Sequence, residues 1–290
     1  MEKRISGHTR LLALIGSPVG HSGSPAMYNY CFEKLGLDYA YAAFDVKEDG
    51  VKEALEAMRL FNMRGMNVTM PDKVEAAKYM DELSPAAKLI GAVNTIVNED
   101  GKLVGYNTDG EGFVNNLRDY GGEVKNKKIV VAGGGGAATA IIVQCALDGA
   151  KEISIFNKKD SFFARTLETA EKVRKAVSGC TINVYDMDDV PKLTEEIQAS
   201  DLFVNATIVG MKPMDSESVV KDLSALHPGL WVADIVYNPE ETKLLKDAKA
   251  AGCICVGGKG MLIWQGASAF RLYTGEEMPV EEVKELLYGK

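Results

Sequence analysis

Short apolar runs alternate with amphipathic segments along almost the whole chain, and this alternation restricts the fold more than any other feature. Runs at 11–16, 39–46 and 65–70 have the length of buried strands, while segments 24–36 and 51–60 have apolar residues at helical spacing. Ser24 is expected as the N-cap of the first helix, Pro25 in its first turn and Gly36 after its end. Strands that alternate with helices predict βαβ units with mostly parallel sheets. We therefore expect an α/β fold.

The alternation starts again near Lys127, which predicts a second α/β domain. Strands are expected at 128–132, 152–156, 181–185, 201–206, 230–236 and 253–258, after a hairpin in 92–107 that turns at Asp100-Gly101. A chain of 290 residues is long enough for two domains at roughly 100–200 residues each. We place one domain at residues 1–114, completed by helices in 265–290, and the other at 115–264.

Composition narrows the class of protein and its partners. The 33 basic and 41 acidic side chains give a net charge of −8, which argues against a nucleic-acid partner. No apolar run approaches the roughly 18 residues of a membrane span. The five cysteines and three histidines show no metal-ligand spacing. We expect reduced thiols, no metal and a cytoplasmic protein, with one of Cys253 and Cys255 packed inward.

A glycine cluster follows the expected strand at 128–132. Residues 133–138 read Gly-Gly-Gly-Gly-Ala-Ala and satisfy the pattern G-x-G-x-x-[GA] between a strand and a helix. Glycine allows a tight turn and a close approach of diphosphate, and the helix N-terminus supplies N–H groups. A glycine cluster can also be a simple loop, but the strand–turn–helix context favours a dinucleotide site. The second domain is therefore expected to be of the Rossmann type.

The end of the following strand, Asn157-Lys158-Lys159-Asp160, carries mixed signals about the cofactor. A carboxylate about 20 residues after the glycines accepts a hydrogen bond from the adenosine 2′-OH of NAD. The two lysines could instead contact the 2′-phosphate of NADP. Asp160 could also cap the next helix. The residues alone leave NAD and NADP both open.

Three polar clusters fall where strands of the first half are expected to end. They are Ser22–Ser24, Asn67–Lys73, and Asn94-Thr95 with 107–110. In open α/β sheets ligands bind outside the carboxyl ends of the strands. Hydroxyls, amides, one lysine and one aspartate there would suit a polyhydroxylated carboxylate. Taken one at a time, each cluster can also be a helix cap, as at Ser24 or Asp109.

Several of these motifs together resemble the shikimate dehydrogenase family, in order along nearly the whole chain. They are SPVGHSGSPAMYN, NVTMPDK, GAVNTI, GYNTDG, GGGGA and GMLIWQGA. The stretches NKKDSFF, VGMKP and HPGLWVADIVYNPEETKLL are more similar to the quinate/shikimate dehydrogenase branch than to the strictly NADP-dependent branch. Two departures stand out. Gly134 replaces the usual Ala and is expected to be harmless, and Lys158-Lys159 replaces a pair that is often arginine.

The resemblance implies roles for particular residues. Lys73 and Asp109 would be the catalytic pair and would also touch substrate. The other substrate contacts would be Ser22 and Ser24 on the carboxylate, Thr69 and Asn94 on ring hydroxyls, with Tyr237 and Gln265 as further contacts. The dinucleotide would be held by Gly133, Gly134, Gly135, Gly136, Ala137, Asn157, Lys158 and Asp160. Ile235, Val236, Tyr237, Asn238 and Gly258 would lie on its nicotinamide side.

The implied activity is NAD(P)-dependent interconversion of shikimate and 3-dehydroshikimate, and also of quinate and 3-dehydroquinate, in aromatic amino acid biosynthesis. Oxidation of a secondary alcohol needs a group that takes the hydroxyl proton, and a lysine can do this when partial desolvation lowers its pKa. A neighbouring carboxylate such as Asp109 favours the ammonium form instead. The cofactor is expected to be NAD, with NADP also admitted, and a homodimer is left open.

Other interpretations of the same residues remain. A non-catalytic dinucleotide-sensing protein would bind cofactor without turnover, and a methyltransferase could have a similar glycine loop. His21 adjoins the serine cluster and is a second candidate for the proton carrier, although a local hydrogen bond is the more usual role of a loop histidine. Trp264 and Phe270 are spaced as core residues of a helix.

Overall fold

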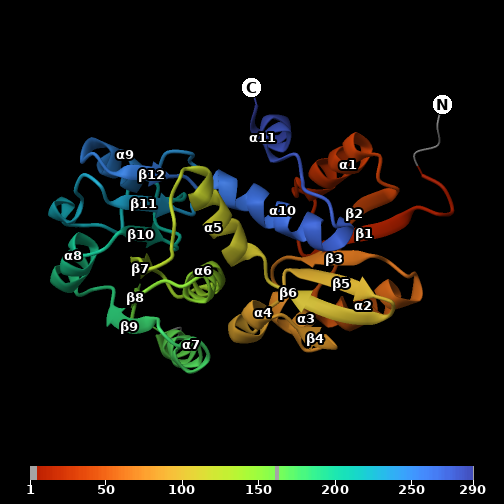
Figure 1. Cartoon of the computed structure of the whole chain (residues 1–290), viewed down its shortest axis with the longest axis horizontal. Helices are drawn as coiled ribbons and strands as arrows, with labels where there is room; N and C mark the ends of the chain where they lie inside the picture. The colour runs from red at the N-terminus through yellow and green to blue at the C-terminus, as the bar shows by residue number, and fades with distance from the viewer. Residues whose placement is uncertain (1–4, 161–162, 290) are drawn as a thin grey trace. The chain divides into compact units, whose positions relative to one another are not determined.

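The computed structural model describes residues 5–160 and 163–289 and divides the chain into two compact units. Unit 1 comprises Met1–Thr108 and Gln265–Lys290, and unit 2 comprises Asp109–Trp264. Each contains one sheet with its own helices (Figure 1). Within the described residues, no helix is both long and apolar enough to cross a membrane.

Unit 1 is built on a six-stranded sheet in the order β2-β1-β3-β5-β6-β4. Its strands are β1 (Arg10–Gly16), β2 (Tyr39–Asp45), β3 (Gly65–Val68), β4 (Glu82–Leu83), β5 (Thr95–Glu99) and β6 (Lys102–Tyr106). Its helices are α1 (Ser24–Leu35), α2 (Val51–Leu60), α3 (Lys73–Ala77), α4 (Pro85–Ile90) and α11 (Val280–Tyr288), with the larger part of α10 (Lys259–Thr274).

Most neighbouring strands of this sheet are parallel, as the alternation predicts. β1 pairs in parallel with β2 and β3, and β4 pairs in parallel with β6, whereas β5 is antiparallel to both β3 and β6. The β5–β6 hairpin turns at Asp100 (φ 52°) and Gly101 (φ 95°), as expected for an Asp-Gly turn. The parallel strands β1 and β3 therefore end at one edge, near Ser22–Ser24 and Asn67–Lys73. Asn94-Thr95 was also expected at a strand end but lies at the start of β5, which reaches the same edge because it runs antiparallel to β3.

Two local predictions in unit 1 are wrong. Ser24 is the first residue of α1 rather than its N-cap; Gly23 takes the cap position, and the Ser22 hydroxyl accepts a hydrogen bond from the Ser24 amide at 3.2 Å. The strand at 65–70 ends already at Val68, and the next helix starts at Lys73 rather than Pro71. Residues 69–72 are therefore a connecting loop, which leaves Thr69 and Asp72 outside regular structure.

Unit 2 has a six-stranded sheet in the order β12-β11-β10-β7-β8-β9, with every pair of neighbours parallel. Its strands are β7 (Lys128–Ala132), β8 (Glu152–Asn157), β9 (Thr181–Asp186), β10 (Leu202–Asn205), β11 (Trp231–Asp234) and β12 (Ile254–Val256). Its helices are α5 (Asp109–Asp119), α6 (Gly136–Leu147), α7 (Phe163–Ala176), α8 (Val190–Gln198) and α9 (Lys243–Ala250), with the start of α10. In Figure 1, α7 lies beside β9 and α9 beside β12.

Read from β9, the strands follow the order 3-2-1-4-5-6 of a doubly wound dinucleotide-binding fold. The order reverses between β7 and β10, and such a switch point is where ligands bind in open parallel sheets. The glycine cluster follows β7 directly. The predicted α/β class and the Rossmann type of this unit are therefore confirmed.

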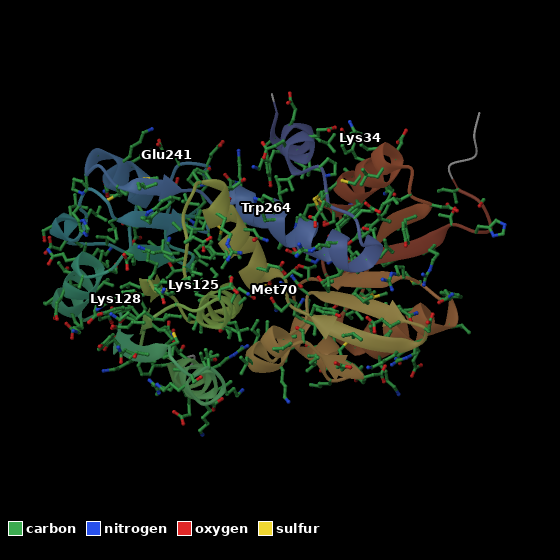
Figure 2. All side chains as sticks on the ribbon, in the orientation of Figure 1. Lys34, Met70, Lys125, Lys128, Glu241 and Trp264 are labelled. Carbon is green, nitrogen blue, oxygen red and sulfur yellow. The ribbon has the colours of Figure 1, made fainter. Side chains whose placement is uncertain are left out.

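The cysteine pair and two aromatic residues of α10 show how far packing was predictable. Cys253, just before β12, and Cys255, within it, both pack against the core cluster that includes residues of β10, β11 and α9. The expectation that one of the two packs inward is therefore wrong. Trp264, labelled in Figure 2, is half-buried, and its indole nitrogen donates to Asp119 at 3.1 Å. Phe270, in unit 1, is fully buried as expected.

Candidate functional site

The glycine loop after β7 begins with a residue that must be glycine. Gly133 has φ +122°, in a region that favours glycine, and its amide donates to the carbonyl of Phe156 at 2.8 Å. A Cβ added at Gly133 would lie 2.6 Å from the carbonyl oxygen of Ala206. The loop therefore passes tightly between the ends of β8 and β10, at the switch point of the sheet.

The third and fourth glycines of the loop face open space, beside helix-terminal N–H groups that no described side chain caps. Gly135 and Gly136 are exposed, and an ideal Cβ at either position meets no described atom within 4 Å. Gly135 is the N-cap of α6, no described side chain caps this helix, and its first turn has no acidic residue. Uncapped N–H groups and the positive end of a helix dipole suit a phosphate. The predicted residues Gly133–Gly136 and Ala137 therefore fit a dinucleotide diphosphate.

The residues predicted to meet the adenosine ribose lie at the end of β8. Asn157 is half-buried, and its side-chain nitrogen donates to the Thr166 hydroxyl at 3.0 Å. Lys158, Lys159 and Asp160 are exposed. The ammonium of Lys159 lies 3.2 Å from Asp186 and contributes, after a backbone hydrogen bond from Asp188, to a lowered pKa of that carboxyl. One of the two lysines is thus already paired with a carboxylate.

A buried polar network orders the loops that follow β10 and β11. The side-chain amide of Asn205 donates to Asp234 at 3.0 Å, and the Thr242 hydroxyl donates to the same carboxylate at 2.6 Å. Burial raises the pKa of Asp234 despite these hydrogen bonds and a third from the Val236 amide. Sequence reasoning missed this network, although Asn205 and Asp234 are the last residues of two apolar strands.

The same loop carries the residues predicted to face the nicotinamide. A Cβ added at Gly258 would collide with the backbone of Ile235 and lie 2.9 Å from the carbonyl oxygen of Val236, so this glycine and the loop are in close contact. Tyr237 is half exposed and Asn238 is exposed. The structure therefore brings Ile235, Val236 and Gly258 together within unit 2.

In unit 1, Asn94 is the centre of a buried hydrogen-bond network at the strand ends. Its Oδ1 accepts from the Thr108 amide and from the Thr95 hydroxyl, both at 2.9 Å. Its Nδ2 donates to the Thr108 hydroxyl at 3.0 Å and lies 3.5 Å from Oε1 of Gln265 on α10. Asn94 and Gln265, far apart in the sequence and both predicted to contact substrate, are therefore neighbours in unit 1.

A second part of this network includes Tyr41, which sequence reasoning missed. Its hydroxyl donates to Asn67 at 2.8 Å, and the Asn67 amide donates to the carbonyl of Asn94 at 3.1 Å. Burial raises the pKa of Tyr41 well above its ordinary value, and Ser24 also hydrogen bonds to it. Ser24 is thereby linked to Asn67 and Asn94. The alternating pattern of 39–46 marks Tyr41 only as an inward strand residue.

Backbone hydrogen bonds hold the remaining predicted residues of unit 1. The carbonyl of Lys73 accepts from the Val93 amide at 2.9 Å, while the next residue, Asn94, binds the Thr108 amide. Lys73 is half-buried at the start of α3, and Thr69 is half-buried where β1 ends at Gly16. Asp109 follows Thr108 directly and, like Tyr237, belongs to unit 2. His21, the second candidate for the proton carrier, is exposed.

Asp72 is an unusual neighbour for a candidate proton carrier. It is fully buried, and both of its carboxylate oxygens lack a hydrogen-bond partner among the described residues. Burial, with smaller contributions from Glu48 and Asp45, raises the pKa of this carboxyl. An unpaired carboxylate in such a place is destabilising when ionised. The sequence motif gave no sign of this, because the position reads as an ordinary helix cap.

We expect Asp72→Asn to stabilise the protein by roughly 1–3 kcal/mol at pH 8, the usual range for an unsatisfied buried group. A carboxyl whose pKa is raised by folding costs nothing at low pH, where it is protonated in both states, and destabilises the fold as the pH rises through its native pKa. The gain should therefore shrink towards pH 4. Urea unfolding of both proteins between pH 4 and 8 measures it.

Asp215→Asn is the control for this prediction, because Asp215 is exposed. It should change the free energy of unfolding equally little at every pH. A gain for Asp72→Asn that is the same at pH 4 and pH 8 would show that its charge has no part in the effect.

Strand order and the glycine loop define the class of this protein: it is an α/β dinucleotide-binding protein with a separate polar site at strand ends. Two family models match it, the shikimate dehydrogenase substrate binding domain over residues 14–96 and the shikimate 5′-dehydrogenase C-terminal domain over 258–288. The chain is 49% identical over 286 residues to shikimate dehydrogenase (NADP(+)) of Listeria innocua, covering 99% of this chain and 98% of that protein.

Two further relatives agree. The quinate/shikimate dehydrogenase of Escherichia coli is 46% identical, with 98% of each chain covered. The structure of shikimate 5-dehydrogenase from Listeria monocytogenes in complex with shikimate and NAD superposes with a TM-score of 0.96 at 48% identity, covering 99% of each chain. The chain belongs to the shikimate dehydrogenase family, which confirms the prediction, and it is an oxidoreductase of that family.

Proposed function

We propose that this protein oxidises shikimate to 3-dehydroshikimate, and reverses the reaction, with a nicotinamide dinucleotide as hydride carrier in aromatic amino acid biosynthesis. The Asn94 network carries this proposal. It gathers an amide, two hydroxyls and Gln265 at the strand ends of unit 1, beside the backbone that anchors Lys73. Quinate also combines a carboxylate with ring hydroxyls, and one relative is named for both substrates. We propose quinate as a second substrate.

The substrate contacts follow from the chemistry of the groups. Ser22, just before α1, and Ser24, its first residue, carry hydroxyl groups two residues apart, and they are assigned to the carboxylate. Thr69 and Asn94 are assigned to ring hydroxyls, with Gln265 next to Asn94 as a further contact. Tyr237 is assigned to the substrate from unit 2. The Tyr41–Asn67 hydrogen bond supports Ser24 and Asn94 from behind and keeps their orientation fixed.

Lys73 and Asp109 are proposed as the pair that handles the proton. The Lys73 carbonyl accepts a hydrogen bond from the Val93 amide, and the amide of Thr108, the residue before Asp109, donates to the Asn94 side chain. The adjacent residues Val93 and Asn94 therefore hold the backbone at Lys73 and the backbone next to Asp109. As an amine, Lys73 takes the proton of the hydroxyl that is oxidised, and as an ammonium it returns that proton in the reverse direction. Asp109 is proposed to orient the ammonium group. The nicotinamide, when bound, accepts or supplies the hydride.

The dinucleotide is proposed to bind unit 2, with NAD preferred and NADP accepted. The open glycines and the uncapped start of α6 support a diphosphate there. Asp160 offers an acceptor to the 2′-OH of NAD and repels a 2′-phosphate, whereas Lys158 would attract it; Lys159 is already paired with Asp186. Asn157 adds a neutral contact. Ile235, Val236, Tyr237, Asn238 and Gly258 are proposed to lie on the nicotinamide side.

We also propose which part of the chain binds substrate and which part binds the dinucleotide. Residues 1–114 with 265–290 would bind substrate, in agreement with the substrate-binding model that matches 14–96. Residues 115–264 would bind the dinucleotide.

We propose a cytoplasmic location, which the free thiols of the five described cysteines support. We also propose a homodimer, which sedimentation would test.

A spectrophotometric assay of nicotinamide reduction tests the proposal, with shikimate or quinate and NAD or NADP in all four combinations. We expect turnover with shikimate in combination with both dinucleotides, more efficient with NAD, and slower turnover with quinate. Dinucleotide binding without turnover on either substrate would show a sensing protein instead. Absence of dinucleotide binding would contradict the function of unit 2.

A further inference from the structure

The second glycine of the loop is required for space rather than for backbone conformation. A Cβ added at Gly134 would lie less than 3.0 Å from the Thr166 hydroxyl and from the side-chain amide of Asn157, whereas its φ is outside the left-handed region. Real Cβ atoms almost never make such contacts. Gly134 is buried, so there is no empty side towards which a side chain could turn. An alanine at this position of the chain would therefore require the Thr166 and Asn157 side chains or the loop to move.

The groups that fill this space are hydrogen bonded to each other. The Asn157 side-chain nitrogen donates to the Thr166 hydroxyl at 3.0 Å, and Thr166 is only 3% exposed. The Asn157 carbonyl accepts from the Met187 amide at 2.9 Å, which fixes the backbone at the end of β8. The amide oxygen of the Asn157 side chain has no partner among residues 5–160 and 163–289. With its nitrogen engaged by Thr166, the amide leaves an acceptor free for a ligand.

We propose that Thr166 is a positioning residue of the dinucleotide site, which orients the Asn157 amide so that its oxygen shares with the Asp160 carboxylate the hydrogen bond that the adenosine 2′-OH donates. Gly134 leaves the room in which this pair can lie against the diphosphate loop. The proposal rests on the proposed dinucleotide function of unit 2. An ionised 2′-phosphate has no proton to donate to that oxygen, so Thr166 selects for NAD over NADP. Without the hydroxyl, the amide is free to turn and present its nitrogen instead.

Thr166→Val tests this role, because valine keeps the shape of threonine and removes only the hydroxyl. Thr166→Ser is the matched control that retains it. Dissociation constants for NAD and NADP are measured by titration of the same preparations. We expect Val to weaken NAD binding about three- to tenfold, the value of one neutral hydrogen bond, while NADP binding stays within about twofold. Ser should bind both as the wild type does, and the KM for shikimate should not change.

Equal weakening of NAD and NADP by Thr166→Val would overturn the proposal and leave Thr166 a structural role. Unchanged NAD binding would overturn it as well. Binding of neither dinucleotide by the wild type would instead contradict the function proposed for unit 2. Thermal unfolding of each variant, compared with wild type, identifies the fraction that is folded in every titration.

The packing of Gly134 gives a second, independent measurement. Gly134→Ala is expected to weaken NAD binding more than tenfold, because the new methyl group pushes the Asn157–Thr166 pair or the loop aside. Thr166→Ala removes the hydroxyl that the new Cβ meets. The double variant should therefore bind NAD more tightly than Gly134→Ala alone, although Thr166→Ala alone weakens binding. Strictly additive losses would contradict the coupling, since independent sites are additive and residues in contact or in one hydrogen-bond network are not.

Discussion

Lys73→Ala is expected to lower kcat for shikimate oxidation by roughly 10²–10⁴, the usual loss for a missing general acid–base group. The KM for shikimate should change far less, because the serine hydroxyls and the Asn94 network remain in place. The variant should fold, since the lysine contributes its carbonyl to the Val93 hydrogen bond and alanine supplies the same group. Steady-state kinetics in both directions measure the effect, with circular dichroism as a check on folding.

Two controls separate this role from binding and from general charge. Lys78→Ala removes a lysine that follows the same short helix and pairs with Glu75, and it should leave kcat within about twofold. His21→Ala removes the second candidate for the proton carrier, an exposed loop residue. If His21→Ala abolishes turnover, the proton carrier has been assigned to the wrong residue. A rise in KM with kcat intact for Lys73→Ala would make Lys73 a binding residue.

Asp160→Ala is expected to weaken NAD binding about ten- to a hundredfold and to leave NADP binding unchanged or improved. A hydrogen bond from the adenosine 2′-OH to a carboxylate contributes about 1.5–3 kcal/mol, which corresponds to this range. The same carboxylate opposes a 2′-phosphate, so its removal relieves repulsion. Asp160 is exposed at the end of β8, and its loss should not disturb the core. Titration with each dinucleotide measures both constants.

Asp189→Ala is the matched control, because Asp189 caps α8 by accepting a hydrogen bond from the Lys192 amide at 3.1 Å. It shows what the loss of a cap alone does: stability should fall by about 0.5–2 kcal/mol with no change in dinucleotide preference. If Asp160→Ala weakened the binding of NAD and of NADP equally, Asp160 would be a helix cap like Asp189 and not a cofactor contact. A wild type that binds NADP far more tightly than NAD would show that the lysines dominate.

The strands that alternate with helices could be predicted because their pattern is local. The glycine loop after β7 could be predicted for the same reason, since the strand, the turn and the helix start lie within a few residues of one another. The antiparallel hairpin at Asp100-Gly101 followed from its turn residues. The order of the strands was not predicted, because pairing between β7 and β10, for example, depends on packing across a long stretch of sequence.

Short elements were missed for a different reason. β4 has only two residues, and a pattern of two residues has no period. α4 could have been found from its ends, because Ser84 caps it, Pro85 starts it and Gly91 ends it in the left-handed conformation. At the start of α1 the same signals led to a wrong N-cap. Proline suits the first or the second helical position, so Pro25 is compatible with a cap at Ser24 or at Gly23, and the structure has Gly23.

The supporting residues of the site could not be predicted from their own positions. Tyr41 and Thr166 each look like ordinary core residues of a strand and a helix, and they gain a role only through Asn67 and Asn157. Asp72 looks like a cap and is instead a buried carboxyl without a partner in the described structure. Residues proposed to contact a ligand stood out through their motifs. Residues that hold those contacts in place needed the structure.

The central claim is that hydride passes between a ring carbon of shikimate and a dinucleotide held by unit 2. Shikimate that carries deuterium at carbon 3, incubated with NAD and the enzyme, tests this claim most directly. Mass spectrometry or NMR of the reduced dinucleotide should show the deuterium in the nicotinamide ring, in equal amount to the 3-dehydroshikimate formed. Release of the deuterium to water, or a reduced dinucleotide without it, would contradict direct hydride transfer in this protein.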